Sequence, residues 1–151
     1  MRRESIYSTH ARICVGGQLF GYNGKMPGVL EEILIAIDYN QPIYLLGAFG
    51  GVVGEVCKIL NGKLYPESLT EAWQVGHNEG YVDLQKIALR HGMHADYNLV
   101  KTVLECVDVS AIAKNAGLND DAYLRLMEAP FLDECLHIVL LGLKNLSDRE
   151  F

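Results

Sequence analysis

Glycines are concentrated between residues 16 and 28, in the stretch GGQLFGYNGKMPG, which leads directly into an apolar helical pattern. Backbone N–H groups in such a loop can converge on an anion because no Cβ obstructs them. The first turn of the following helix adds unpaired donors and the positive end of its dipole. We therefore predict a phosphate-binding loop whose ligand-binding residues are Gly16, Gly17, Gly21, Gly24, Lys25, Met26, Pro27 and Gly28.

The alternative interpretation of this stretch is a purely structural turn from strand to helix. The glycine spacing matches neither the dinucleotide-binding pattern Gly-x-Gly-x-x-Gly nor the P-loop, which requires Gly-Lys-Ser/Thr. Five glycines in thirteen residues are nevertheless more than such a turn needs. Lys25 would add a mobile point charge to the loop.

Two adjacent carboxylates, Glu31 and Glu32, fall in the first turn of the helix predicted after Pro27. Negative charge near a helix N-terminus is favourable by about 0.3–1 kcal/mol in any case, so pairing with the dipole explains them. One carboxylate could instead accept hydrogen bonds from ribose hydroxyls at the mouth of the loop. It could also stabilise positive charge developing on a sugar ring, in which case Glu31 and Glu32 are the catalytic candidates of a hydrolase.

A second glycine-rich segment, GAFGG, follows the apolar run PIYLL. Open α/β sheets bind ligands beyond the carboxyl ends of adjacent strands, where this segment would lie. Its glycines would let a ligand approach the backbone, and its phenylalanine could either stack on a base or pack internally. We expect the two glycine loops to lie side by side and form one cleft, to which this segment adds Gly47, Phe49, Gly50 and Gly51.

Neither a metal site nor a nucleophilic triad is indicated. His91 and His94 are three residues apart, but Gly92 interrupts the helix between them and no carboxylate-rich motif accompanies them. There is no Gly-x-Ser-x-Gly and no serine or cysteine placed for a triad. We expect no metal and no cofactor. Three aromatic residues are assigned to the core or an interface: Trp73, Tyr81 and Tyr97.

Charge and composition limit the classes of partner. The 151 residues include 13 Lys and Arg against 19 Asp and Glu, a net charge of −6. This balance argues against direct nucleic-acid binding, which requires a basic face. An anionic ligand would therefore be held mainly by backbone dipoles and one or two cations. The length corresponds to one domain with a sizeable core.

The cysteines and apolar runs bear on the cellular compartment. Cys14, Cys57, Cys106 and Cys135 lie in apolar segments without a chelating pair, which predicts reduced, buried thiols. The start, MRRESIYSTH, is polar after its basic residues and does not resemble a secretory signal. Apolar runs such as residues 136–143 are far shorter than the roughly 20 residues that span a bilayer. We expect a cytoplasmic protein that does not enter a membrane.

Residues 11–15 and 42–46 are predicted to be buried strands, separated by a helix over residues 27–40 that Asn40 closes. A second helix covers residues 52–60, so this part predicts a βαβ unit with a parallel strand pair. Residues 2–9 are expected to form a short lead-in helix. From residue 68 onward the chain is predicted to be helical over residues 68–74, 81–92, 97–117, 119–129 and 130–146, with Asn119 or Asp120 as the N-cap of the fourth segment.

The fold class is therefore α/β, a short parallel sheet flanked by helices with a mainly helical C-terminal half. Two parallel strands do not make a stable sheet alone. Either one helix is misread, or the partner strands lie outside this chain, in a neighbouring subunit or in a longer parent protein.

The stretch ARICVGG…GYNGKMPGVLEEILIAI…PIYLLGAFGG resembles the SLOG superfamily, which unites Lonely-guy phosphoribohydrolases with DNA-processing-A-like and nucleotide-sensor domains. It looks most like the SLOG domains of prokaryotic conflict and nucleotide-signalling proteins. A later segment, NAGLNDDAYLRLMEAP, is similar to an Asn-Gly-Leu element followed by acidic residues near the end of such domains.

This resemblance implies a single Rossmann-like domain over residues 1–151 that lacks the strands usually found before ARICVGG. It implies a nucleotide or an NAD-derived nucleotide, such as an ADP-ribose derivative, as ligand. The Lonely-guy pattern Pro-Gly-Gly-x-Gly-Thr followed by glutamate is not met, because MPGVL lacks the run of glycines and the threonine. Carried over by position, the phosphate-binding loop comprises Gly16, Gly17, Gly24, Pro27 and Gly28, with Glu31 or Glu32 at its acidic helix start.

Three functions remain open from the sequence. The favoured one is a sensor that binds a nucleotide-derived signal, forms a homo-oligomer and regulates an effector domain or protein. The second is an N-glycosidic hydrolase of nucleoside 5′-monophosphates, a phosphoribohydrolase. The third is an oligomerisation module in which the glycine loop is structural.

Overall fold

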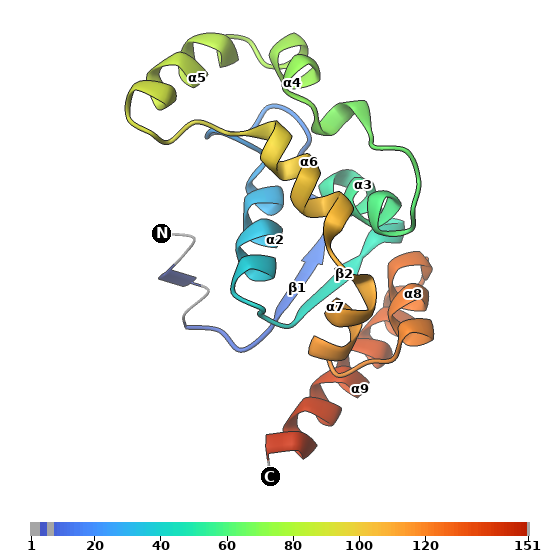
Figure 1. Cartoon of the computed structure of the whole chain (residues 1–151). Helices are drawn as coiled ribbons and strands as arrows, with labels where there is room; N and C mark the ends of the chain where they lie inside the picture. The colour runs from blue at the N-terminus through green and yellow to red at the C-terminus, as the bar shows by residue number, and fades with distance from the viewer. Residues whose placement is uncertain (1–3, 6–7, 151) are drawn as a thin grey trace.

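A computed structural model describes residues 4–5 and 8–150, the last by its backbone only (Figure 1). Of the lead-in helix expected over residues 2–9, residues 4–5 are helical and residues 8–9 are not, while residues 2–3 and 6–7 lie outside the described residues. Two short strands, β1 (Arg12–Val15) and β2 (Ile43–Leu46), form a parallel sheet. Their register pairs Arg12 with Ile43 and Val15 with Leu46, so the predicted strand pair is confirmed. Strand β2 is buried as expected, but β1 is not, because Ile13 and Val15 on one of its faces are about half exposed.

Helix α2 (Gly28–Asp38) connects the two strands, and α3 (Gly51–Leu60) follows β2 after a 3-10 turn, η1 (Gly47–Phe49). Both helices cover the sheet face that carries Arg12 and Cys14. Arg12 Nη1 contacts Glu32 Oε2 of α2 at 2.7 Å, and Cys14, like Cys57 of α3, is buried. This part of the chain is the predicted βαβ unit.

The second half is helical, as expected, and is joined to α3 through the turn η2 (Glu67–Leu69). The segment predicted as one helix over residues 97–117 is two helices, because Asp108 accepts a hydrogen bond from the Ser110 amide at 3.0 Å and starts a new one. Asn119 is the predicted N-cap of the next helix, accepting from the Ala122 amide at 2.8 Å. The six helices are α4 (Glu71–His77), α5 (Tyr81–Arg90), α6 (Tyr97–Cys106), α7 (Val109–Asn115), α8 (Asp120–Glu128) and α9 (Leu132–Glu150).

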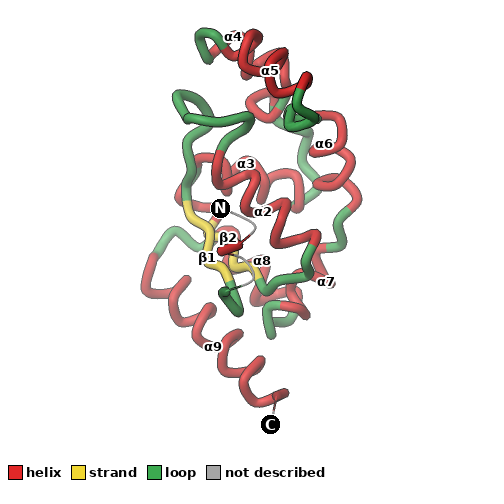
Figure 2. The backbone as a smooth tube through the Cα atoms, turned by 90° about the vertical axis from the view of Figure 1, so that its left-hand side faces the viewer, coloured by secondary structure: helices red, strands yellow, loops and turns green. Residues whose placement is uncertain are grey.

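Helix α9 crosses the other face of the sheet close to Tyr44. A Cβ at Gly142 would lie 2.8 Å from the Tyr44 hydroxyl, which donates to the Ala116 carbonyl at 2.8 Å. By register, Ile13 shares this face with Tyr44, yet its side chain remains about half exposed. Figure 2 shows α9 passing below the strands and extending beyond them toward the C-terminus.

The outer edge of β2 is closed by a side chain. Tyr123 of α8, fully buried, donates from its hydroxyl to the Ile43 carbonyl at 2.8 Å and has a backbone hydrogen bond with Leu45. Burial raises the pKa of Tyr123 well above its usual value, so the phenol stays protonated. This explains how a sheet with two strands among the described residues persists: one edge is satisfied by a helix instead of a third strand.

The four cysteines are free thiols; Cys106 is exposed, contrary to the expectation, and the other three are buried. Within residues 4–5 and 8–150, the structure contains no helix long and apolar enough to cross a membrane.

Candidate functional site

The loop after β1 begins with backbone that only glycine adopts easily. Gly17 has φ +98°, and a Cβ there would lie 2.9 Å from the Val29 Cβ and 3.1 Å from the Val52 Cβ. Gly17 therefore allows α2 and α3 to approach the end of β1, which is a packing role. The predicted ligand residues Gly16, Gly21 and Gly24 also have positive φ, but a Cβ at any of them would meet at most one atom, at 4.0 Å.

The two glycine loops lie side by side, as expected. The carbonyls of Gly16 and Gly17 accept hydrogen bonds from the amides of Val53 at 2.9 Å and Val52 at 3.1 Å. A Cβ at Gly51 would lie only 2.5 Å from the Gly17 carbonyl oxygen. The first-turn amides of α3 are thus engaged by the neighbouring loop.

Helix α2 has the opposite arrangement at its start. Its N-cap residue, Pro27, offers no side-chain hydrogen bond, and the Glu31 amide is the first to bond within the helix, to the Pro27 carbonyl at 3.1 Å. The amides of Gly28, Val29 and Leu30 find no acceptor in the described part of the chain. Three donors and the positive end of the dipole therefore converge at the loop–helix junction, which suits an anion.

The charged side chains around this junction form two separate ion pairs. Lys25 Nζ lies 3.8 Å from Glu31 Oε1, a loose contact between partly exposed groups. Glu32 instead pairs with Arg12 at 2.7 Å, which ties α2 to β1. The two carboxylates that the sequence treats as equivalent thus have different surroundings, and only Glu31 faces the junction.

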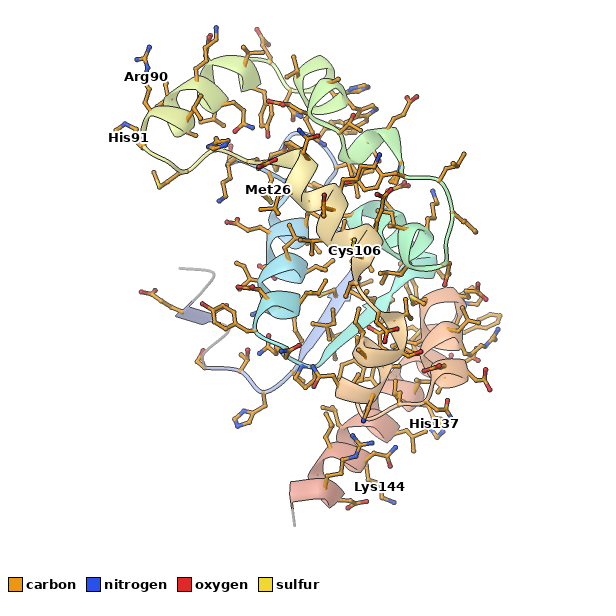
Figure 3. The ribbon with its side chains drawn as sticks, viewed as in Figure 1. Met26, Arg90, His91, Cys106, His137 and Lys144 are labelled. Carbon is orange, nitrogen blue, oxygen red and sulfur yellow. The ribbon has the colours of Figure 1, made fainter. Side chains whose placement is uncertain are left out.

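A groove of about 710 Å³ runs from this junction along α2 toward α6. Of the predicted site residues, only Lys25, Met26 and Glu31 line it. The predicted residues that do not line it are Gly16, Gly17, Gly21, Gly24, Pro27, Gly28, Glu32 and those of the second loop, Gly47, Phe49, Gly50 and Gly51. Figure 3 places Met26 near the start of α2, facing α6. The adjoining glycine loops therefore do not share this groove. Its remaining lining residues are Leu34, Ile35, Ile37, Asp38, Gly92, Met93, His94, Asp96, Leu99, Val100 and Val103.

The loop after β2 is engaged mainly in packing. A Cβ at Gly47 would lie 2.6 Å from both the Cys57 Sγ and the Met127 carbonyl oxygen, so the absence of a side chain lets α3 and α8 approach it. Phe49 is exposed, and Gly50 has open space around it.

Helices α4 and α5 hold the glycine loop through a polar network that the sequence did not reveal. Gln74 is fully buried and donates from Nε2 to the carbonyls of Leu19 at 3.0 Å and Ser68 at 2.7 Å. The Tyr22 hydroxyl donates to Gln74 Oε1, and the Gly21 amide donates to Asn78 Oδ1 at 2.8 Å. The loop is thus fastened at several points to segments more than fifty residues away.

Tyrosines complete this network on the side of the groove. The Tyr81 hydroxyl donates to the Lys25 carbonyl and lies 2.9 Å from the Tyr97 hydroxyl. Both rings are buried, which agrees with their assignment to the core, and burial raises the pKa of each phenol. The backbone of Lys25 at the junction is thereby held by the Tyr81 hydroxyl.

Trp73 lies on α4, partly exposed, and stacks on His77 with ring centroids 3.7 Å apart. Phe20 of the loop lies 6.2 Å from the Trp73 ring and is exposed. Groups of three or more His, Cys, Asp or Glu that could hold a metal ion are absent from the described residues.

A family model described as SLOG cluster2 matches residues 1–126, which include both glycine loops and end within α8. Neither the curated proteins nor the solved structures yield a match.

Proposed function

The chain belongs to the SLOG cluster2 family, which suggests a nucleotide-related function, and from this premise we propose that it is a sensor of a nucleotide or NAD-derived nucleotide such as an ADP-ribose derivative. A phosphate group of the ligand would bind at the junction of the glycine loop and α2. Binding would then regulate a partner protein or effector domain.

One observation carries this proposal: the first turn of α2 has no cap, whereas the first turn of α3 is engaged. The amides of Gly28, Val29 and Leu30 point out of the helix start without an acceptor among the described residues. Lys25 is the nearby cation, and its contact with Glu31 at 3.8 Å is loose enough to be exchanged for a phosphate.

The groove beside the junction suits the nucleoside part of such a ligand. Its lining combines apolar side chains with the carboxylates of Glu31, Asp38 and Asp96. Carboxylates accept hydrogen bonds from ribose hydroxyls. We therefore place a phosphate at the helix start and the ribose beside Glu31.

The test is a titration with ADP-ribose, cyclic ADP-ribose isomers, NAD and AMP, in which the melting temperature of the protein is measured at each ligand concentration. Binding at 100 times the dissociation constant should add about 2.7 kcal/mol to the free energy of unfolding. A panel that leaves the melting temperature unchanged at millimolar concentration contradicts the proposal.

Pro27→Asp sharpens this test. An aspartate at the N-cap would accept the free amides and repel a phosphate, while adding up to about 1 kcal/mol of helix stability. We expect the ligand-induced shift to disappear without loss of folding. Pro27→Ser, which caps without charge, should weaken the shift less and guards against misfolding of the aspartate variant at this buried position.

Lys25→Met and Lys63→Met form a matched pair. Lys25 lines the junction, whereas Lys63 is exposed in the turn after α3. The proposal requires loss of ligand response in the first variant alone. Equal loss in both would indicate nonspecific attraction by net charge.

The second candidate is an N-glycosidic hydrolase, favoured by the placement of Glu31 in the groove. Its carboxylate would stabilise positive charge on the ribose ring and orient water. Release of free base from nucleoside 5′-monophosphates, abolished in Glu31→Gln and retained in Glu32→Gln, would support this reaction. If the wild-type protein binds these nucleotides without releasing free base, the result contradicts the hydrolase and supports the sensor.

A further inference from the structure

Helix α9 carries a stripe of exposed leucines that no described residue covers. Because residues in a helix turn by about 100° each, residues 132, 136, 140 and 143 lie on one face. Cys135, Ile138 and Val139 on the adjoining face are buried against the rest of the fold. We name as the leucine stripe the four exposed side chains Leu132, Leu136, Leu140 and Leu143.

A contiguous apolar surface of this kind on a folded chain marks an interaction site. The leucine stripe also lies beyond residue 126, where the family match ends, and away from the groove beside α2. Its function is therefore separate from that of the proposed ligand site.

Charged residues along one flank of the stripe suggest what covers it. Asp133, His137 and Lys144 all fall within about 40° of one another around the helix, on the same side of the leucines. Figure 3 shows His137 and Lys144 projecting from the same side of α9. Asp133 and Lys144 are exposed, and neither has an ion-pair partner among the described residues.

We propose that a second copy of this chain docks on the leucine stripe, with the two α9 helices antiparallel about a two-fold axis midway between Leu136 and Leu140. This axis places Leu136 against Leu140 of the other copy. It also brings Asp133 within one residue, or about 1.5 Å of helix rise, of the level of the other copy's Lys144. Both groups lie on the same flank, so the two-fold creates two symmetric ion pairs.

A parallel arrangement of the helices gains nothing from these charges. Its two-fold axis would carry the charged flank of the second copy to the opposite side of the pair, so Asp133 and Lys144 would not meet. An anionic membrane surface would favour a flank that is basic throughout, whereas this one has a carboxylate at one end and a lysine at the other. The alternation is therefore self-complementary only in the antiparallel dimer.

The test begins with the molar mass of the protein over a concentration series, measured by sedimentation. Leu136→Glu should abolish the dimer, because it would bury a charge in the apolar interface. Leu141→Glu is the matched control: Leu141 is on the same helix and 43% exposed, against 44% for Leu136, but lies off the stripe. It should leave the dimer intact.

A charge exchange tests the antiparallel register itself. Asp133→Lys and Lys144→Asp alone should each weaken dimerisation by about tenfold, and the double variant should restore it. A monomeric wild-type protein, equal effects of Leu136→Glu and Leu141→Glu, or no rescue in the double variant would each overturn the proposal. Nucleotides should still stabilise the Leu136→Glu monomer. Loss of the dimer can therefore be distinguished from failure of the ligand site.

Discussion

The carbonyl oxygen of Gly17 accepts a hydrogen bond from the amide of Val52 at 3.1 Å. Backbone from the loop after β1 thereby occupies the start of α3, the helix that follows the other strand. The start of α2, which the same loop enters directly, keeps its amides free of acceptors among the described residues. One glycine loop thus closes one helix terminus and leaves the adjacent one open to a ligand.

Gly17→Ala should destabilise the protein by about 2–4 kcal/mol. The new methyl group would contact Val29 and Val52 at about 3 Å and would also require positive φ in a residue with a Cβ. Gly16→Ala is the control, with φ +64° and no atom within 4 Å, and should cost only about 1 kcal/mol. Urea denaturation measures both; equal losses would mean that backbone conformation alone matters.

Gln74→Ala should loosen the glycine loop as well as destabilise the fold by roughly 2–3 kcal/mol, because it leaves the partly buried carbonyls of Leu19 and Ser68 without their donor. Hydrogen exchange at the Gly21 amide, which is bonded to Asn78, should become faster. Gln85→Ala removes another buried glutamine, which bonds to Ala95 instead. If that variant accelerates exchange at Gly21 as much, the effect reflects global stability and not the network.

Tyr123→Phe removes one oxygen atom from the edge of β2. The Ile43 carbonyl would lose its donor while remaining buried, at a cost of about 1–3 kcal/mol. Tyr65→Phe, which removes a longer bond of 3.2 Å from a half-buried hydroxyl, should cost less. Thermal denaturation compares the two, and a larger effect at Tyr65 would refute the role given to Tyr123.

Stability should decrease in alkaline solution. Burial raises the pKa of Cys14 and Cys57 to about 12, above the ordinary value of 9.0. The unfolded chain therefore releases these protons at lower pH than the folded chain. The free energy of unfolding thus keeps its full value below about pH 8.5 and falls between about pH 9 and 12. Equilibrium unfolding in urea across this range measures the loss.

Thiol modification provides an independent check on the same residues. Cys106 is exposed and should react with a thiol reagent in the folded protein, whereas Cys14 and Cys57 should react only after unfolding. Cys106→Ser should remove the rapid phase. Rapid modification of more than one thiol in the native protein would contradict the burial of the other cysteines.

The elements nearest the glycine loops could be predicted because local signals define them. Pro27 marks the start of α2, and glycines follow both strands, so the boundaries lie in the sequence itself. The division between α6 and α7 was missed because the apolar pattern continues through it; the capping side chain of Asp108 was the available signal.

The site was harder to predict where distant residues determine it. Gly47 resembles a ligand-binding glycine in isolation, yet its close contact is with the backbone of Met127, eighty residues later. Gln74 gives no sign in its own polar helix that it will be buried against Leu19. The separation of Glu31 from Glu32 likewise follows from where Arg12 lies in the folded chain, which no local pattern specifies.

The phenol of Tyr123 also determines at which edge the sheet can take up a further strand. An edge strand with free amides and carbonyls invites further strands, including those of aggregating chains. Because the hydroxyl occupies that position beside β2, growth on this side is blocked at Ile43. Any strand added to this sheet, from whatever source, must therefore join β1, where Ile13 and Val15 already present half-exposed apolar side chains.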